Sequence, residues 1–267
     1  MTLCAAAIAE TESCIATISD TMIAGSTISS DGCAVKMEPF ARDWVAMFSG
    51  DDITPCLPII KRAEGYLKGR ANTLSNVRTI FKRAFQQHLI EMKTDQVLSG
   101  YGLDMKTFEK SGRKRFTAEI FNSLCYRMNE IKTTCEFLIY GFDSSGRAHI
   151  FTVSDPGTDS VFDKPGFACI GSGRYAADTM LHYFGQSVSS SLPQTVFNLS
   201  AAKFMAERSP GVGKETFLYF KRPGSVASRW IGGLLEGLRD NWEKDGRPKM
   251  SAAALDFIST MGIRTLP

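Results

Sequence analysis

The sequence has no long apolar run, no long stretch dominated by charge of one sign and few histidines. Only three histidines occur among 267 residues, and the seven cysteines are scattered without a Cys-x-x-Cys pair. Zinc sites need closely spaced ligands and disulfide frameworks need paired cysteines, so we expect neither a metal nor a disulfide scaffold. Cysteines without such a framework are typical of a reducing cytoplasm, which is the expected location.

Charge and hydropathy also limit the partners. Lysine plus arginine exceed aspartate plus glutamate by only 31 − 28 = 3, which gives no reason to expect nucleic acid. The basic run at residues 110–115 is interpreted as a solvated loop. The apolar residues 3–9 have no basic flank and stop at Glu10, so they predict neither a signal peptide nor a membrane span. No phosphate-binding loop motif occurs, so any ATPase partner is expected to be a separate chain.

Within the first hundred residues the spacing of the apolar positions changes once, from the spacing of strands to that of helices. Residues 3–9 and 14–19 are short apolar segments around the polar turn 10–13, and they predict a β-hairpin. A second pair of strands is predicted at residues 33–37 and 44–48. From residue 54 to residue 98 the apolar positions follow the spacing of one buried helical face, and this stretch predicts two helices that residues 69–72 divide.

The same order of strands and helices then recurs. Residues 99–115, rich in Gly, Lys and Ser, are predicted to form a loop, and residues 116–131 a helix. Further strands are predicted at residues 136–142, 149–154, 166–170 and 216–221, and further helices at 175–183, 194–207, 226–242 and 251–261. This order predicts an α+β fold, with two antiparallel sheets stacked face to face and helices outside them. We expect one layered domain at 1–223 and a helical extension at 224–267.

Several short motifs, in their order and spacing, resemble the proteasome β-type family of N-terminal nucleophile hydrolases. They are Met1-Thr-Leu-Cys-Ala-Ala-Ala-Ile-Ala-Glu10, Ile18-Ser-Asp20, Val35-Lys36, Phe48-Ser-Gly50, Tyr140-Gly-Phe-Asp143 and Ile170-Gly-Ser-Gly173 followed by Tyr175-Ala-Ala177. The start is most similar to the bacterial branch called Anbu, and the Gly-Ser-Gly segment resembles the bacterial HslV peptidase. The resemblance covers residue 2 to about residue 221, and it implies a four-layer αββα sandwich.

The resemblance implies that Thr2, exposed by removal of Met1, attacks an amide carbonyl with its hydroxyl. A methionine ahead of a small residue is readily removed, and its loss leaves a free α-amine beside that hydroxyl. Such an amine has a reference pKa of about 7.7 to 8.0, so a useful fraction is neutral near physiological pH. It can therefore act as the general base, through a water molecule. The expected activity is that of a threonine protease, a hydrolase without a cofactor.

Four further residues match positions of the family. Asp20 and Lys36 are sixteen positions apart; the lysine ammonium favours loss of the nucleophile's proton, and the aspartate holds that lysine in place. Gly50 is implied to supply a backbone N–H to the oxyanion hole. Ser172 is implied to bond the terminal amine through its hydroxyl. Each of the four also has a purely structural interpretation, as a turn or strand residue.

The position of the nucleophile leaves two alternatives. In the family the threonine lies sixteen positions before the aspartate, whereas Thr2 lies eighteen before Asp20 and Cys4 lies sixteen before it. Either the turn at residues 10–13 is two residues longer, or Cys4 is the nucleophile after loss of three residues; we favour Thr2. Residues 207–211 depart in spacing from the family's supporting Asp-x-x-Ser, so none of them is assigned a role.

Three functions are compatible with these residues. The first is a peptidase inside a homo-oligomeric ring, acting on peptides or unfolded proteins and served by a separate ATPase where one is needed. The second is a small-molecule amidohydrolase, because a fold does not fix its substrate. The third is a catalytically silent ring subunit, for which keeping Thr2, Asp20, Lys36 and Gly50 together has no chemical reason.

Overall fold

The computed structural model describes residues 2–24, 29–30, 35–41, 43–225, 228–229 and 234–246. Contacts divide the chain into two units, Met1–Ile231 and Gly232–Pro267. In the second unit the helix α7 (Leu234–Asn241) runs into a π-helical turn, Trp242–Gly246. The helix predicted at 226–242 therefore begins later than expected, and that predicted at 251–261 lies outside the described residues. The first unit holds two five-stranded antiparallel sheets.

One sheet is built around the N-terminal hairpin and has the strand order β10-β1-β2-β11-β12. Its strands are β1 (Cys4–Ala9), β2 (Cys14–Asp20), β10 (Phe167–Ile170), β11 (Thr216–Lys221) and β12 (Ser228–Arg229). The predicted hairpin is confirmed, with Cys4 opposite Ser19. Because the Asp20 N–H also donates to the Leu3 carbonyl at 3.2 Å, the end of β2 lies beside the residues that precede β1.

The other sheet has the order β5-β6-β7-β8-β9. Its strands are β5 (Met37–Ala41), β6 (Trp44–Ser49), β7 (Glu136–Phe142), β8 (Ala148–Ser154) and β9 (Thr158–Val161). The strand predicted at 33–37 instead begins at Met37 and includes Pro39, which an edge strand tolerates because one side of its backbone has no ladder partner. Besides β9, the prediction missed a two-stranded ribbon of β3 (Ile23–Ala24) and β4 (Ser29–Ser30).

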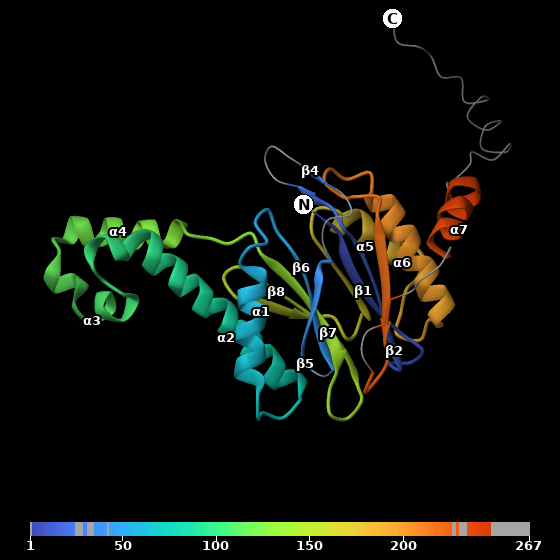
Figure 1. Cartoon of the computed structure of the whole chain (residues 1–267), viewed down its shortest axis with the longest axis horizontal. Coiled ribbons are helices and arrows are strands. Elements are labelled where there is room, and N and C mark those ends of the chain that lie inside the picture. The colour runs from blue at the N-terminus through green and yellow to red at the C-terminus, as the bar shows by residue number, and fades with distance from the viewer. Residues whose placement is uncertain are drawn as a thin grey trace, which may run out of the picture. The chain divides into compact units, whose positions relative to one another are not determined.

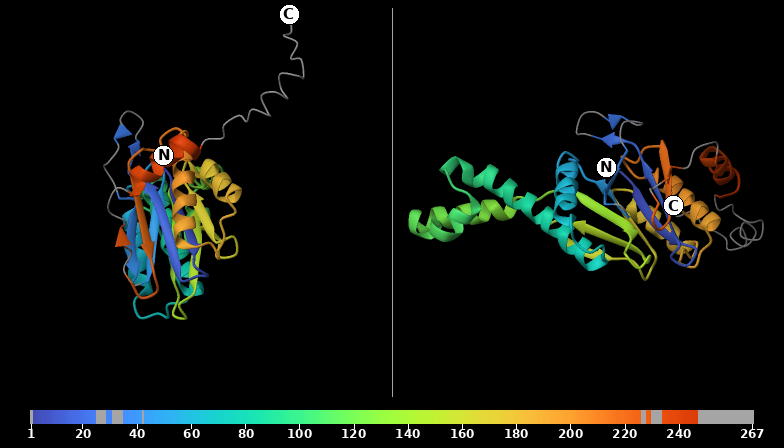
Figure 2. Two further views of the ribbon diagram at one scale, coloured as in Figure 1. Left: turned by 90° about the vertical axis from the view of Figure 1, so that its right-hand side faces the viewer. Right: turned by 60° about the horizontal axis from the view of Figure 1, so that its bottom comes forward.

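Helices cover the outer face of each sheet, which gives four layers (Figure 1 and Figure 2). The covering helices are α1 (Cys56–Leu67) and α2 (Leu74–Lys93) on the second sheet, and α5 (Arg174–Tyr183) and α6 (Leu192–Ala206) on the first. Phe81 of α2 packs edge-on against Phe137 of β7, with ring centroids 5.0 Å apart. The divided helices predicted within 54–98 are thus confirmed.

The core between the sheets follows the alternation of the strands. On β1 the side chains of Cys4, Ala6 and Ile8 point into a cluster with Leu138 and Tyr140 of β7. The alternate residues of β1 are alanines, fully buried on the face that α5 and α6 cover. These small side chains let the helices approach closely, so the hairpin is buried on both faces and holds its ends in fixed positions.

One predicted loop, residues 99–115, is wrong. A short 3₁₀ turn (Ser99–Tyr101) follows the π-helical turn Thr94–Leu98 that ends α2, and then α3 (Met105–Arg115) and α4 (Ala118–Glu130) form a helical pair at the far end of α2 (Figure 1). Asp104 caps α3 by accepting from the Thr107 N–H at 2.7 Å, and Phe108 stacks on Phe121 at 5.0 Å. The basic run is the exposed last turn of α3, where positive charge favours the helix dipole.

Candidate active site

Thr2 lies directly before β1 and is buried, with 1% of its surface exposed. Its hydroxyl donates a hydrogen bond to Asp20 Oδ1 and accepts one from Lys36 Nζ. The lysine also contacts the same carboxylate oxygen, at 3.1 Å. We call these three residues, Thr2, Asp20 and Lys36, the Thr2 cluster. The structure thus brings together Thr2, Asp20 and Lys36, which the sequence analysis singled out as the nucleophile and its charged pair.

Asp20 holds this cluster in place through the backbone. Its carboxylate accepts from the N–H groups of Leu3 at 2.9 Å, Met22 at 3.2 Å and Gly213 at 3.0 Å. Lys36 is equally buried, and it accepts at its carbonyl from the Phe48 N–H at 3.2 Å. An ion pair is costly to bury unless additional hydrogen bonds such as these satisfy its charged groups. The same hydrogen bonds hold the cluster in a fixed orientation toward the Thr2 oxygen.

The sequence analysis did not find the support behind Gly213. Lys203 on α6 is fully buried and donates to Glu207 Oε1 and to the Gly213 carbonyl, both at 2.7 Å. Lys203 therefore holds the loop at Gly213, and the N–H of the same Gly213 donates to the Asp20 carboxylate. The only signal in the sequence is a Lys and a Glu four positions apart, which is also the pattern of an ordinary surface pair.

Gly171 and Ser172 close the site from β10. Gly171 has φ +90°, and a Cβ there would lie 2.3 Å from the Thr2 carbonyl oxygen, so only glycine fits. The Ser172 hydroxyl lies 3.4 Å from that carbonyl oxygen and 3.1 Å from the Pro210 carbonyl. The Ser172 hydroxyl has one proton, and in this structure it donates toward these carbonyl oxygens. The resemblance had implied a hydrogen bond to the terminal amine.

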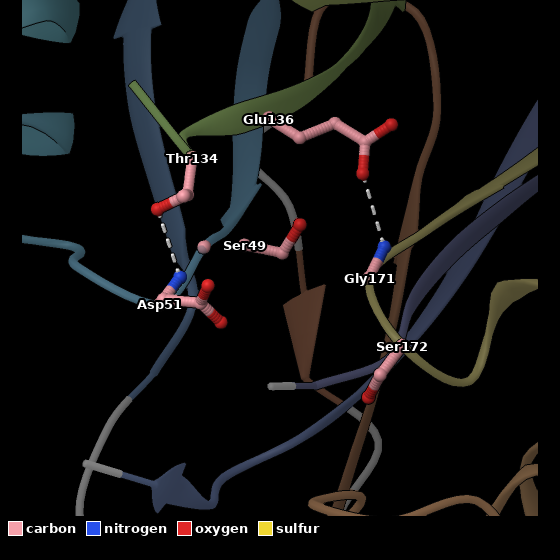
Figure 3. A pocket seen from close by; sticks show the side chains of 7 residues that line it. Ser49, Asp51, Thr134, Glu136, Gly171 and Ser172 are labelled. Carbon is pink, nitrogen blue, oxygen red and sulfur yellow. Dashed lines mark hydrogen bonds between the residues drawn. The ribbon is translucent and has the colours of Figure 1, made fainter. Parts of the chain in front are cut away.

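A cavity of about 240 Å³ adjoins these residues (Figure 3). It is lined by Ser49, Gly50, Asp51, Thr134, Glu136, Gly171 and Ser172. Gly50, at the end of β6, packs closely here, since a Cβ would lie 3.0 Å from the Thr134 carbonyl oxygen. Gly171 and Ser172 belong both to the cavity wall and to the surroundings of Thr2, so the Thr2 cluster and the cavity are neighbours.

Cys4, the alternative nucleophile, is a core residue in this structure. Its thiol is buried between the sheets and donates to the Phe48 carbonyl oxygen at 3.5 Å. Burial raises the pKa of the Cys4 thiol to about 12, with the nearby Lys36 only partly opposing this, so little thiolate forms near neutral pH. The turn between β1 and β2 has four residues, two more than the commonest hairpin turn.

A second group of buried charge surrounds His149 on β8. Its ring lies 2.7 Å from an Asp163 oxygen and 3.4 Å from an Asp143 oxygen, and it stacks on Trp44 at 6.0 Å. Burial lowers the pKa of His149, but the two carboxylates outweigh it and the pKa is raised. We call His149, Asp143 and Asp163 the His149 cluster.

Two further findings concern the part of the chain that the structure describes. There, no three His, Cys, Asp or Glu side chains are gathered as a metal ion would require. Nor does any helix in that part have the length and apolar character needed to cross a bilayer.

The comparisons with known proteins support the fold. No family model and no curated protein matches this sequence. Among solved structures, the chain is similar to the Gly-1 mutant of Anbu from Hyphomicrobium sp. strain MC1, with a TM-score of 0.61, 14% sequence identity and 100% of each chain covered. At this identity the likeness shows the fold, that of a proteasome-like N-terminal nucleophile hydrolase. It confirms the predicted resemblance and the αββα sandwich.

Proposed function

We propose that this chain is a threonine-type amide hydrolase, and that the Thr2 hydroxyl is its nucleophile. The observation that carries the proposal is the Thr2 cluster: a buried hydroxyl held between an ammonium and a carboxylate, beside a cavity. An ammonium that donates to the Thr2 oxygen stabilises the alkoxide that forms when the hydroxyl loses its proton. Asp20 keeps the ammonium at that oxygen.

The proposed base is the α-amine of Thr2, set free when the preceding residue is removed. It takes the hydroxyl proton through a water molecule as the oxygen attacks the carbonyl carbon. As the tetrahedral intermediate collapses, the protonated α-amine gives this proton to the nitrogen of the scissile bond, which leaves as a neutral amine, and the acyl group remains on Thr2 as an ester. Water hydrolyses this ester and restores the hydroxyl.

Gly50 is proposed to stabilise the oxyanion through its backbone N–H. In support, Gly50 lines the cavity and directly follows β6, and the neighbouring strand β5 begins directly after Lys36. Ser172 lines the opposite wall and keeps the Thr2 carbonyl in place. We assign it a positioning role.

Substrate and assembly are also part of the proposal. We propose peptides or unfolded proteins as substrates, a homo-oligomeric ring as the working form in the cytoplasm, and a separate ATPase where unfolding is needed. The support is the fold alone. The mass in solution tests this: an assembly of many subunits supports a confined peptidase, whereas a monomer or dimer favours a small-molecule amidohydrolase.

The chemistry is tested by three variants assayed on a mixed library of quenched fluorescent peptides. Thr2→Ala should lower turnover by about a thousandfold or more, as removal of a nucleophile does elsewhere, and alanine leaves removal of Met1 intact. Thr2→Ser should keep part of the activity, and Cys4→Ser should stay close to the wild type. Full activity of Thr2→Ala, or an active protein that retains Met1, would refute the proposal.

A further inference from the structure

The described side chains that line the cavity beside the Thr2 cluster are carboxylates and hydroxyls, with no lysine, arginine or histidine among them. Asp51 and Glu136 contribute carboxylates, which only accept when ionised, and Ser49, Thr134 and Ser172 contribute hydroxyls. Since a water molecule occupies about 30 Å³ of liquid, a cavity of about 240 Å³ holds roughly eight waters, or a single side chain.

Ser49 gives the first indication that the cavity binds a ligand. Only 3% of its surface is exposed, and Figure 3 shows its hydroxyl oxygen pointing into the cavity. Within the described residues this hydroxyl makes no hydrogen bond, but its oxygen is not one of the fully buried oxygens that lack a partner, so it is accessible from the cavity. Water in the cavity, or a ligand group that displaces this water, satisfies it.

Asp51 is the second sign. Its backbone N–H is held by the Thr134 hydroxyl at 3.1 Å, which fixes the start of the loop after β6. Its carboxylate makes no ion pair or hydrogen bond with the described residues. Glu136 differs, because its two oxygens accept from the Gly171 N–H at 3.2 Å and from Arg174 at 3.1 Å. Of the two carboxylates at the cavity, that of Asp51, which is exposed to solvent, is therefore the one without a counter-charge among the described residues.

We infer that the cavity receives a cationic side chain of the substrate, a guanidinium or an ammonium, next to the amide that is attacked. Asp51 supplies the counter-charge, and Ser49 accepts a further N–H. Such groups carry only donors, which the carboxylate and hydroxyl oxygens of the wall can accept, whereas an acidic side chain would face the Asp51 carboxylate, which has no counter-charge. The inference rests on the proposed function, whose substrate class it narrows to peptides with arginine or lysine at the cleaved bond.

Binding tests this without turnover. In the Thr2→Ala protein, we compare the affinities of two peptide pairs that carry arginine or neutral citrulline, before the amide in one pair and after it in the other. In one of the two positions arginine should bind roughly fivefold more tightly, the upper range for a partly exposed ion pair. Adding Asp51→Asn should abolish that preference, and adding Ser49→Ala should reduce it about twofold.

Glu109→Gln is the matched control, because Glu109 is an exposed acid on α3, outside the cavity. It should leave the preference for arginine unchanged. Equal binding of arginine and citrulline in both positions, or a preference that survives Asp51→Asn, would overturn the inference. Asp51→Lys should reverse the preference toward glutamate.

Hydrolysis of the same peptides by the wild type separates the two proposals. Hydrolysis at neutral residues as fast as at arginine would overturn the cationic specificity and leave the threonine mechanism intact. Conversely, a preference for arginine in binding, with no peptide hydrolysed, would support the cavity's specificity and contradict the proposed chemistry.

Discussion

The Thr2 cluster and the His149 cluster are two groups of buried charge at opposite ends of the same strand. Glu136 at the cavity and Gly141, the partner of His149, are five residues apart on β7, or about 17 Å. In both clusters a buried basic side chain, Lys36 or His149, lies against carboxylates. The Thr2 cluster contains a hydroxyl and adjoins the cavity described above, whereas the His149 cluster contains no hydroxyl and its imidazole stacks on the Trp44 ring.

This difference separates two uses of buried charge. In the His149 cluster the charges satisfy one another and hold the β7–β8 turn and the segment after β9. In the Thr2 cluster both charged side chains contact one oxygen, that of the Thr2 hydroxyl. We assign this oxygen no role in holding the fold together. We therefore expect changes in the first cluster to affect stability, and changes in the second to affect turnover.

The largest difference between the clusters is expected for Asp20→Asn. The change removes the partner of a buried ammonium, so we expect a loss of about 3 kcal/mol in the free energy of unfolding, and at least a thousandfold loss of turnover because Lys36 is no longer held at the nucleophile. Urea denaturation and peptide hydrolysis measure the two effects. His149→Gln serves as the control and should keep turnover within about twofold.

A substitution of the glycine beside Thr2 should have the next largest effect. Gly171→Ala places a Cβ against the Thr2 carbonyl, at a φ of +90°, and a displacement of the nucleophile by about 1 Å lowers turnover by about a hundredfold. Gly146→Ala is the matched control, since it has φ +81° but open space around it. Comparable loss of turnover in both variants would mean that backbone strain, and not the contact with Thr2, is responsible.

The rate of hydrolysis should fall about tenfold per pH unit below pH 7, as the proposed terminal base becomes protonated. The initial rate on one peptide is measured from pH 5.5 to 8.5, with unfolding followed by circular dichroism at each pH. A flat profile would remove the amine from the mechanism.

The His149 cluster should show the opposite trend, in stability. Because the folded-state pKa of His149 is raised, its contribution is complete below the unfolded value of about 6.5 and is lost as the pH rises through the folded value. His149→Gln should therefore cost about 2 kcal/mol at pH 5.5 and less at pH 9. Urea denaturation of both proteins at the two pH values tests this. A cost that is larger at pH 9 would mean that the charged form is not the stabilising one.

The layers of the fold were largely predictable because their signals are local. The turn at 10–13 and the turn after Phe142 lie between apolar segments, and the buried face of α2 repeats at helical spacing. The helix α3 was missed because residues 99–115, taken together, are rich in Gly, Lys and Ser, and what stabilises the helix is the Asp104 cap and the packing of Phe108 on Phe121. The strand β9 was missed because its four residues, mostly polar, show no alternation.

The site residues named from the sequence came from the resemblance, not from a local pattern. Register of the β1–β2 hairpin brings Asp20 beside the residues before β1, whereas Lys36, directly before β5 of the other sheet, reaches Thr2 with its side chain. Glu136 and Lys203 act through Gly171 and Gly213, residues distant in sequence that only the folded sheet and the packing of α6 bring near Thr2. No local pattern reports such contacts.

The account depends most on Thr2 being the attacking residue. The direct measurement is to react the wild-type protein with a slowly hydrolysed acylating ester, quench in acid, and locate the acyl group by peptide mass spectrometry. We predict one acyl group on the Thr2 oxygen, in a chain whose first residue is Thr2. An acyl group on Cys4, or acylation of a chain that still carries Met1, would contradict the account.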